Sequence, residues 1–135
     1  KKFEKDPNIE VITPIYKLSP DNIHNPNVVK TLVGNRKNAI YFSRSAIPHV
    51  RDKDPNQWHK HAKYWGHVGI YGFRGDVLNQ WNNLPKSELE EVEKLEQLRI
   101  IDGGFKISTF EVEGNFLSVD TKEQLEEARR RIEEQ

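Results

Sequence analysis

The stretch that decides the fold is Val28-Val-Lys-Thr-Leu-Val33, Gly34-Asn-Arg-Lys-Asn38 and Ala39-Ile-Tyr-Phe-Ser43. Its first and last parts are rich in β-branched and aromatic residues, which favour strands. The five residues between them favour turns. Two such runs joined by a short turn-forming segment are typical of a β-hairpin. The sequence therefore predicts a hairpin here.

Two further strands are expected on either side of this hairpin. Glu10–Tyr16 favours a strand, but Pro14 cannot donate a ladder hydrogen bond, so an edge or interrupted strand is expected. Gly66–Phe73 has the alternating residue pattern of a strand and contains three glycines. Glycine in a strand allows another backbone or a ligand to approach closely. We interpret it as a core strand. Residues 45–65 form a long polar loop, of a kind that is often functional or mobile.

Helices are expected in the second half of the chain. Arg74–Trp81 is a candidate for a short helix. Ser87 and Glu90 match a capping box, and apolar residues follow them at helical spacing. The sequence therefore predicts a second helix over Glu88–Ile101, which ends before Gly103-Gly104.

A last strand and a last helix complete the predicted order. Lys106–Val112 alternates like a half-buried strand. Asp120 then caps a helix whose apolar stripe is Leu125, Ala128 and Ile132. Strands that alternate with helices predict an α/β sandwich, and 135 residues suit a single domain.

Composition excludes several classes of protein. The 21 basic residues balance the 21 acidic ones, which argues against a general nucleic-acid binder and against a polybasic membrane-surface protein. Cysteine is absent, so the chain has no disulfides and no cysteine nucleophile. No apolar run is long enough to span a bilayer. We expect a soluble, intracellular domain.

The histidines divide into two groups. His49, His59 and His61 match no zinc spacing and are best interpreted as exposed loop residues. His67 and Tyr71 are four residues apart in the expected core strand, so both rings would point to one face. They either belong to a functional site or are core residues whose polar groups are hydrogen-bonded within the protein.

Other candidate residues also allow two interpretations. Arg44 and Arg51 could grip a carboxylate or phosphate, or could be solvated surface. Asp120 could bind a hard cation or only cap its helix. Glu96 and Gln97 lie between two leucines of the expected helix, so at least one of them should lie near the buried face.

Five ordered stretches give the chain a specific resemblance. They are similar to the 3-deoxy-manno-octulosonate cytidylyltransferase family, the CMP-Kdo synthetases, where Kdo is 3-deoxy-manno-octulosonate. The resemblance extends from Glu10 onward and corresponds to the C-terminal part of the family. The five stretches are Asn25–Lys30, Tyr41–Pro48, His67–Arg74, Leu95–Arg99 and Ser118–Thr121.

The resemblance implies a fold and a reaction. The fold would be a nucleotide-sugar-transferase-like, Rossmann-like α/β sandwich with a mostly parallel sheet and a dimerisation hairpin. The reaction would transfer CMP from CTP to the anomeric hydroxyl of Kdo and release pyrophosphate, with Mg²⁺. The protein would be a cytoplasmic homodimer whose product enters lipopolysaccharide biosynthesis.

The resemblance also implies roles for single residues. Asp120 would be the catalytic, magnesium-binding aspartate. The contacts to the acid sugar would be Arg44, Arg51, His67, Tyr71, Glu96 and Gln97.

Part of the family pattern is missing. Nothing here resembles the family's N-terminal nucleotide loop or its partner magnesium aspartate, and the chain begins at Lys1 and contains no Met. We therefore expect a truncated chain that does not catalyse transfer alone and that leaves part of a sheet edge uncovered. The alternatives are a cytidylyltransferase for a related acid sugar such as 8-amino-Kdo, or a non-catalytic dimerisation or sugar-binding module.

Overall fold

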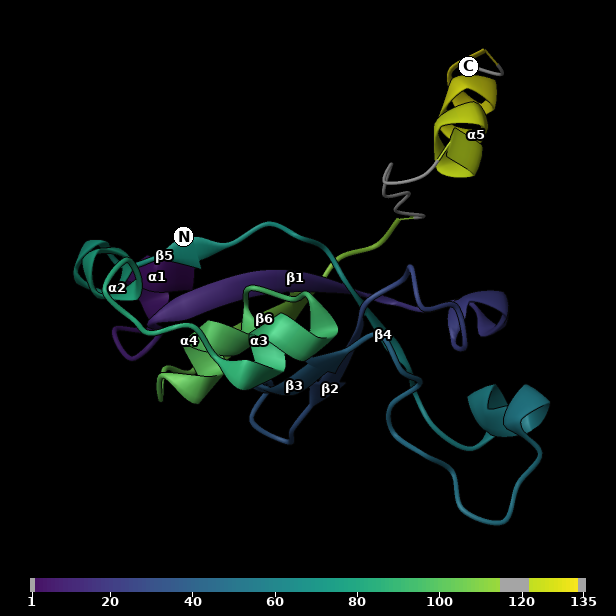
Figure 1. The fold of residues 1–135 in the computed structure, drawn as a ribbon, viewed down its shortest axis with the longest axis horizontal. Coiled ribbons are helices and arrows are strands. Elements are labelled where there is room, and N and C mark those ends of the chain that lie inside the picture. The colour runs from purple at the N-terminus through teal and green to yellow at the C-terminus, as the bar shows by residue number, and fades with distance from the viewer. Residues whose placement is uncertain (1, 115–121, 134–135) are drawn as a thin grey trace.

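One mixed sheet organises the molecule (Figure 1). The computed structural model describes residues 2–114 and 122–133. The sheet has six strands: β1 (Val11–Lys17), β2 (Lys30–Val33), β3 (Ala39–Ser43), β4 (Trp65–His67), β5 (Gly72–Phe73) and β6 (Ile107–Glu111).

The sheet confirms the hairpin and corrects the expected strand directions. β2 and β3 pair antiparallel, as predicted. β4 pairs antiparallel with both β1 and β2, and β5 pairs antiparallel with β1. Within the described residues only β1 and β6 pair in parallel, so the expectation of a mostly parallel sheet is wrong. Parallel pairing needs a long crossover, and the helical segment before β6 supplies one.

β1 is a central strand and not the edge strand that Pro14 suggested. It pairs with β6 on one side and with β4 and β5 on the other. The carbonyl of Pro14 accepts a hydrogen bond from the amide of Val68, so its nitrogen faces the gap between β4 and β5. Residues 68–71 leave the ladder there, and the Thr13 hydroxyl donates to the carbonyls of Val68 and Ile70 in place of the missing proline N–H.

The expected core strand Gly66–Phe73 is interrupted. Its ends form β4 and β5, while residues 68–71 leave the ladder. The predicted close approach is present at Gly66, where a Cβ atom would lie 2.3 Å from the Tyr16 ring. The hydroxyl of Thr13 on β1 reaches the carbonyl of Ile70 at 2.8 Å, which supplies a donor that the ladder does not.

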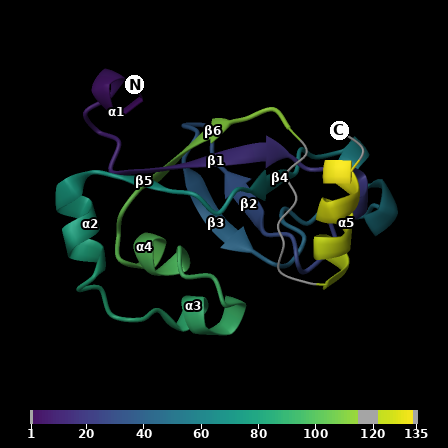
Figure 2. The same cartoon turned by 90° about the horizontal axis from the view of Figure 1, so that it is seen from above.

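The helices lie before, between and after the strands. Figures 1 and 2 show α3 and α4 together on one side of the sheet. The helices are α1 (Lys2–Lys5), α2 (Gly75–Trp81), α3 (Glu88–Glu93), α4 (Leu98–Asp102) and α5 (Lys122–Glu133), and two 3₁₀ turns are η1 (Pro20–Asn22) and η2 (Pro55–Lys60).

The helix expected over 88–101 is two helices. It begins after Ser87 as predicted, but Lys94 adopts a left-handed conformation with φ of 54° and ends α3. The Arg44 guanidinium donates to the carbonyls of Glu93 at 2.9 Å and Lys94 at 3.4 Å, which have no acceptor role left inside α3. A tertiary contact therefore stabilises a helix end that periodicity could not reveal.

Two apolar clusters stabilise the fold. The main cluster lies between the sheet, α2, α4 and Leu95 in the turn before α4. A smaller one fills the loop region around η1 and η2. The buried members of the main cluster are Val11, Phe42, Val77, Leu95, Leu98, Ile100 and Ile107, and those of the smaller one are Leu18, Ile23, Trp58 and Tyr64.

The sheet curls until its hairpin meets β6. The Lys37 carbonyl accepts hydrogen bonds from the amide of Thr109 at 2.7 Å and from its hydroxyl at 2.8 Å. Asn38 and Ser108 form an antiparallel bridge beside them. The turn of the hairpin therefore covers part of the edge of β6.

A buried lysine fixes the base of the hairpin. Lys30 has no exposed surface, and its ammonium donates to the carbonyls of Asn25 at 2.8 Å, Val28 at 2.6 Å and Arg44 at 2.5 Å. All three N–H groups are thus used. Burial and then the positive charge of Arg44 lower the pKa of Lys30 to about 8, although the negative charge of Glu93 opposes them.

Among the residues that the structure describes, no helix combines the length and the apolar character needed to cross a bilayer.

We predict that Leu98→Ala destabilises the protein far more than Leu89→Ala. Leu98 is 1% exposed and Leu89 is 44% exposed. Truncating the buried leucine leaves a cavity and should lower the free energy of unfolding by about 2–5 kcal/mol. The exposed leucine should cost about 1 kcal/mol or less. Urea unfolding measures both, and equal losses would contradict the assigned core.

We also predict that Lys30→Met both destabilises the protein and removes a pH dependence. Leaving three buried carbonyls without a donor should cost at least about 2 kcal/mol at pH 7. In the parent, Lys30 loses its proton near pH 8 when folded and near 10.5 when unfolded. Between these values the unfolded state binds more protons, so stability from this group rises with pH.

Urea unfolding of parent and Lys30→Met at several pH values between 7 and 10.5 tests this prediction. The difference between their free energies of unfolding should widen as pH rises, because all other groups titrate in both proteins. A difference that stays constant would show that Lys30 does not titrate early in the folded chain.

Candidate functional site

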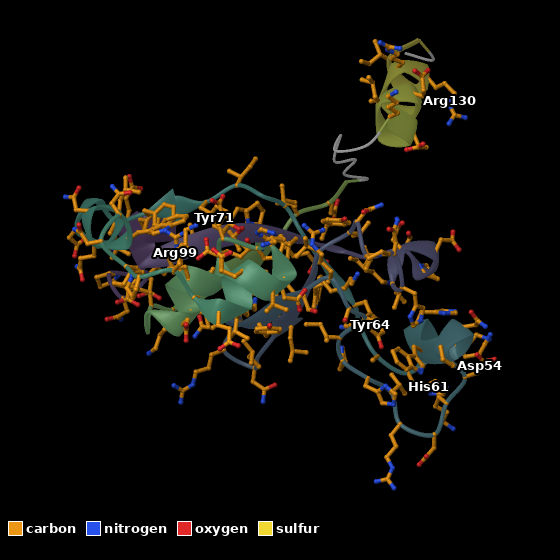
Figure 3. All side chains as sticks on the ribbon, in the orientation of Figure 1. Asp54, His61, Tyr64, Tyr71, Arg99 and Arg130 are labelled. Carbon is orange, nitrogen blue, oxygen red and sulfur yellow. The ribbon has the colours of Figure 1, made fainter. Side chains whose placement is uncertain are left out.

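A cavity of about 560 Å³ lies where the interrupted strand faces the break between α3 and α4. Figure 3 shows Tyr71 and Arg99 near this region, and Asp54, His61 and Tyr64 together at the other end of the molecule. Apart from Val29, which precedes β2, the lining residues come from the interrupted strand and from α3 with the turn that follows it. They are Val29, His67, Gly69, Tyr71, Glu90, Glu91, Lys94, Leu95, Glu96 and Gln97.

His67 ends β4 and forms one wall. Its Nε2 lies 3.0 Å from the Thr13 hydroxyl. Its ring packs edge-on against Phe42, with 4.9 Å between centroids, and lies 5.4 Å from the Tyr71 ring. Burial lowers the pKa of His67 to about 4, so the imidazole is neutral at physiological pH. A neutral imidazole can donate one hydrogen bond and accept another.

Tyr71 connects the cavity to the core. Its ring lies 6.1 Å from that of Phe73 and 6.5 Å from that of Trp81. Burial and then the negative charge of Glu96 raise the pKa of Tyr71, so its phenol stays protonated. It therefore offers an O–H donor to whatever occupies the cavity.

Glu96 and Gln97 lie in the turn between α3 and α4 and not in the middle of a helix. The expectation that one of them is buried is confirmed, since Gln97 is 4% exposed while Glu96 is exposed. The turn directs a carboxylate and a carboxamide to one cavity. Together they offer acceptors and a donor to a polar ligand.

Three ion pairs hold the acidic side of the cavity. Glu90 accepts a bidentate contact from Arg99, with Nε to Oε2 at 2.7 Å. This hydrogen bonding holds the pKa of Glu90 below its ordinary value, although burial opposes it. Glu91 contacts Lys86 at 3.3 Å and Lys94 at 3.6 Å. The pair between Glu90 and Arg99 also spans the break between the helices, which keeps the turn in place.

Arg44 lies beside the cavity, but its guanidinium is used by backbone carbonyls. Besides Glu93 and Lys94, it donates to the carbonyl of Pro26 at 3.1 Å. The Glu93 carboxylate in turn accepts from the Ser43 hydroxyl at 2.6 Å and from the Arg44 amide at 3.0 Å. In this structure Arg44 fixes the turn that lines the cavity, and a contact with a sugar stays a prediction.

Arg51 does not line the cavity, and Asp120 cannot be placed relative to it. The Arg51 side chain is 90% exposed, lies in the long loop and contacts Asp52 at 3.3 Å. Asp120 lies outside the described residues. Residues 2–114 and 122–133 contain no group of three or more His, Asp or Glu side chains placed to hold a metal ion.

Sequence reasoning missed several residues of the site. Glu90, Glu91 and Lys94 line the cavity only because α3 ends early. Val29 and Lys30 were inside a motif that suggested the family, yet nothing in their spacing indicated a role. The buried Thr13 gave no signal at all, because its importance depends on a contact 54 residues away.

Comparison with known proteins agrees with the motifs. The sequence pattern of the family described as Cytidylyltransferase matches residues 3–107. The 3-deoxy-manno-octulosonate cytidylyltransferase of Chlorobaculum tepidum is 42% identical over 135 residues, covering 98% of this chain and 52% of the relative. The enzyme of the same name from Escherichia coli is 42% identical over 124 residues, covering 92% of this chain and 48% of the relative.

A solved structure gives the same result. It is described as CMP:2-keto-3-deoxy-manno-octonic acid synthetase complexed with CTP, and it matches with a TM-score of 0.85 and 39% identity. The match covers 98% of this chain and 53% of that one. The chain thus spans about half the length of the relatives it matches. With the family pattern matched over most of its residues, the chain belongs to the cytidylyltransferase family.

Proposed function

We propose that this chain supplies the acid-sugar site for CMP transfer from CTP to the anomeric hydroxyl of Kdo, which yields CMP-Kdo and pyrophosphate. The observation that carries the proposal is that four predicted sugar contacts line one cavity: His67, Tyr71, Glu96 and Gln97. They come from two segments far apart in sequence. The names of the relatives support the same reaction.

The chemistry of the lining suits a polyhydroxylated ligand. A sugar hydroxyl both donates and accepts, so it is matched by groups of both kinds. Tyr71 donates, Glu96 accepts, and Gln97 does both. These groups lie beside buried apolar surface, where unpaired polar atoms are costly, so a ligand that satisfies them gains specificity.

The carboxylate of the sugar needs a cation. Lys94 is the basic side chain among the described residues that line the cavity. Arg44 uses three N–H groups on carbonyls, and the two that remain could reach a ligand at the rim. Arg51 would contribute only if the long loop lay against the occupied site. We propose Lys94 and Arg44 as the cations nearest to the carboxylate.

Mg²⁺ is proposed as the cofactor, with Asp120 as one ligand. A carboxylate is the ligand type that Mg²⁺ prefers, and the metal commonly uses one or two carboxylates plus substrate phosphates. When bound, it would neutralise phosphate charge during transfer. The part of the chain that the structure describes contains no group of three or more His, Asp or Glu side chains placed to hold a metal ion, so the proposed site rests on Asp120 and substrate phosphates.

The setting is proposed from the family. The protein would act as a homodimer in the cytoplasm and supply lipopolysaccharide biosynthesis. We propose β2–β3, at one end of the strand order, as the dimerisation hairpin. Ile40 on β3 is 56% exposed, which is consistent with a surface that a second copy covers.

We predict that Tyr71→Phe and Gln97→Leu each weaken Kdo binding by about tenfold, which is the effect of about 1.4 kcal/mol. Each removes hydrogen-bonding groups and leaves the size of the side chain nearly unchanged. Isothermal titration calorimetry measures the dissociation constants. Tyr64→Phe is the matched control, because the Tyr64 hydroxyl bonds the Pro48 carbonyl at 2.6 Å away from the cavity. Equal effects of Tyr64→Phe and Tyr71→Phe would contradict the assigned site.

We predict that the 135-residue chain alone releases no pyrophosphate from CTP, Kdo and Mg²⁺. The cavity lining is acidic, so it repels a triphosphate and offers no cradle for one. A coupled pyrophosphate assay measures the rate, with a full-length relative as positive control. Turnover by the chain alone would show that it contains the nucleotide site as well.

A further inference from the structure

The starting observation is a buried hydroxyl behind the cavity. Thr13 lies in the middle of β1, has no exposed surface and does not line the cavity. Its Oγ1 nevertheless lies 3.0 Å from the Nε2 atom of His67, 2.8 Å from the carbonyl oxygen of Ile70 and 3.2 Å from that of Val68. Three polar atoms therefore converge on one hydroxyl.

Counting protons decides the direction of each hydrogen bond. A threonine hydroxyl has one hydrogen to donate and can accept through its oxygen. The carbonyls of Val68 and Ile70 can only accept, so the hydroxyl hydrogen points to them. The contact with His67 is then a hydrogen bond only if Nε2 carries a proton and donates it to Oγ1.

The charge of His67 determines whether its other nitrogen, Nδ1, carries a proton or a lone pair. The imidazole is neutral at physiological pH because burial disfavours the charged form. A neutral imidazole has one N–H, and that proton is on Nε2. Nδ1 therefore carries a lone pair. No contact to Nδ1 is found among the described residues, and the ring itself lines the cavity.

The ring cannot easily turn over, a motion that would exchange each nitrogen with a ring carbon. Phe42 packs edge-on against it, with 4.9 Å between ring centroids, and the Tyr71 ring lies 5.4 Å from it. Phe42 has no exposed surface, so this packing is tight. A ring flip would also place a carbon against the Thr13 hydroxyl and break the only hydrogen bond that Nε2 makes within the described residues.

We propose that Thr13 is a positioning residue that holds His67 in the Nε2–H tautomer, so that Nδ1 accepts a hydrogen bond from a hydroxyl of the ligand. The proton on Nε2 follows from the contacts of Thr13, and the lone pair on Nδ1 follows from the neutral state of the buried ring. The identity of the ligand as an acid sugar rests on the proposed function. The residue acts through His67 and through the backbone at 68–70, and it does not touch the ligand.

Nuclear magnetic resonance of ¹⁵N-labelled histidine in the 135-residue chain tests the tautomer directly. In the parent, long-range ¹H–¹⁵N correlations should show a protonated Nε2 and an unprotonated Nδ1 for His67. Thr13→Ser keeps a hydroxyl and should give the same pattern. Thr13→Val keeps the shape without the hydroxyl and should give a mixture of tautomers. A protonated Nδ1 in the parent would overturn the proposal.

Two readouts separate a positioning role from a merely structural one. If Thr13→Val folds and its His67 keeps the parental pattern, Thr13 does not set the tautomer and the proposal fails. If Thr13→Val does not fold, the parent and Thr13→Ser spectra still decide it. His24, whose Nε2 contacts a carbonyl at 3.0 Å in another region, is the internal reference and should not change.

Adding Kdo separates this inference from the proposed function. The Nδ1 resonance of the parent should shift on binding, and Thr13→Val should bind about tenfold more weakly. An Nε2–H tautomer in a chain that does not bind Kdo would support the role of Thr13 and overturn Kdo as the ligand. Binding of Kdo with no effect at Nδ1 in any variant would overturn the acceptor role of His67.

Discussion

The hydroxyl of Thr13 lies where the sheet stops being continuous, and the cavity depends on it. Residues 68–71 leave the ladder opposite Thr13 and Pro14, so their carbonyls need donors from elsewhere. Pro14 has no N–H to offer, and the Thr13 side chain donates instead of the backbone. The same hydroxyl accepts from His67. One side chain thus shapes the loop and orients a cavity residue.

A second interruption faces the first, and a charged side chain stabilises it. The end of α3 leaves carbonyls that the helix cannot satisfy, and the Arg44 guanidinium donates to two of them. The Lys30 ammonium donates a hydrogen bond to the Arg44 carbonyl. The sequence analysis assigned Arg44 to the ligand and gave Lys30 no role. In the structure both side chains stabilise the backbone around the cavity.

The sequence predicts the elements whose signals are local. The hairpin, the helix α2 and the strand β6 are confirmed, because turn chemistry and periodicity are encoded within a few residues. The continuous strand over 66–73 and the helix over 88–101 are wrong, because each break is stabilised by contacts from distant segments. His67 and Tyr71 still meet, at 5.4 Å between rings, although the strand that was expected to align them is broken.

The balance of charge around the cavity limits what can enter it. Glu90, Glu91 and Glu96 line it, against a single lysine among the described lining residues. Arg99 neutralises Glu90 and lysines contact Glu91, which leaves the region of Glu96 and Tyr71 negative. A triphosphate would be repelled there, whereas sugar hydroxyls would find acceptors. In the proposed transfer, this cavity therefore suits the sugar, and phosphate charge would have to be neutralised by groups outside its lining.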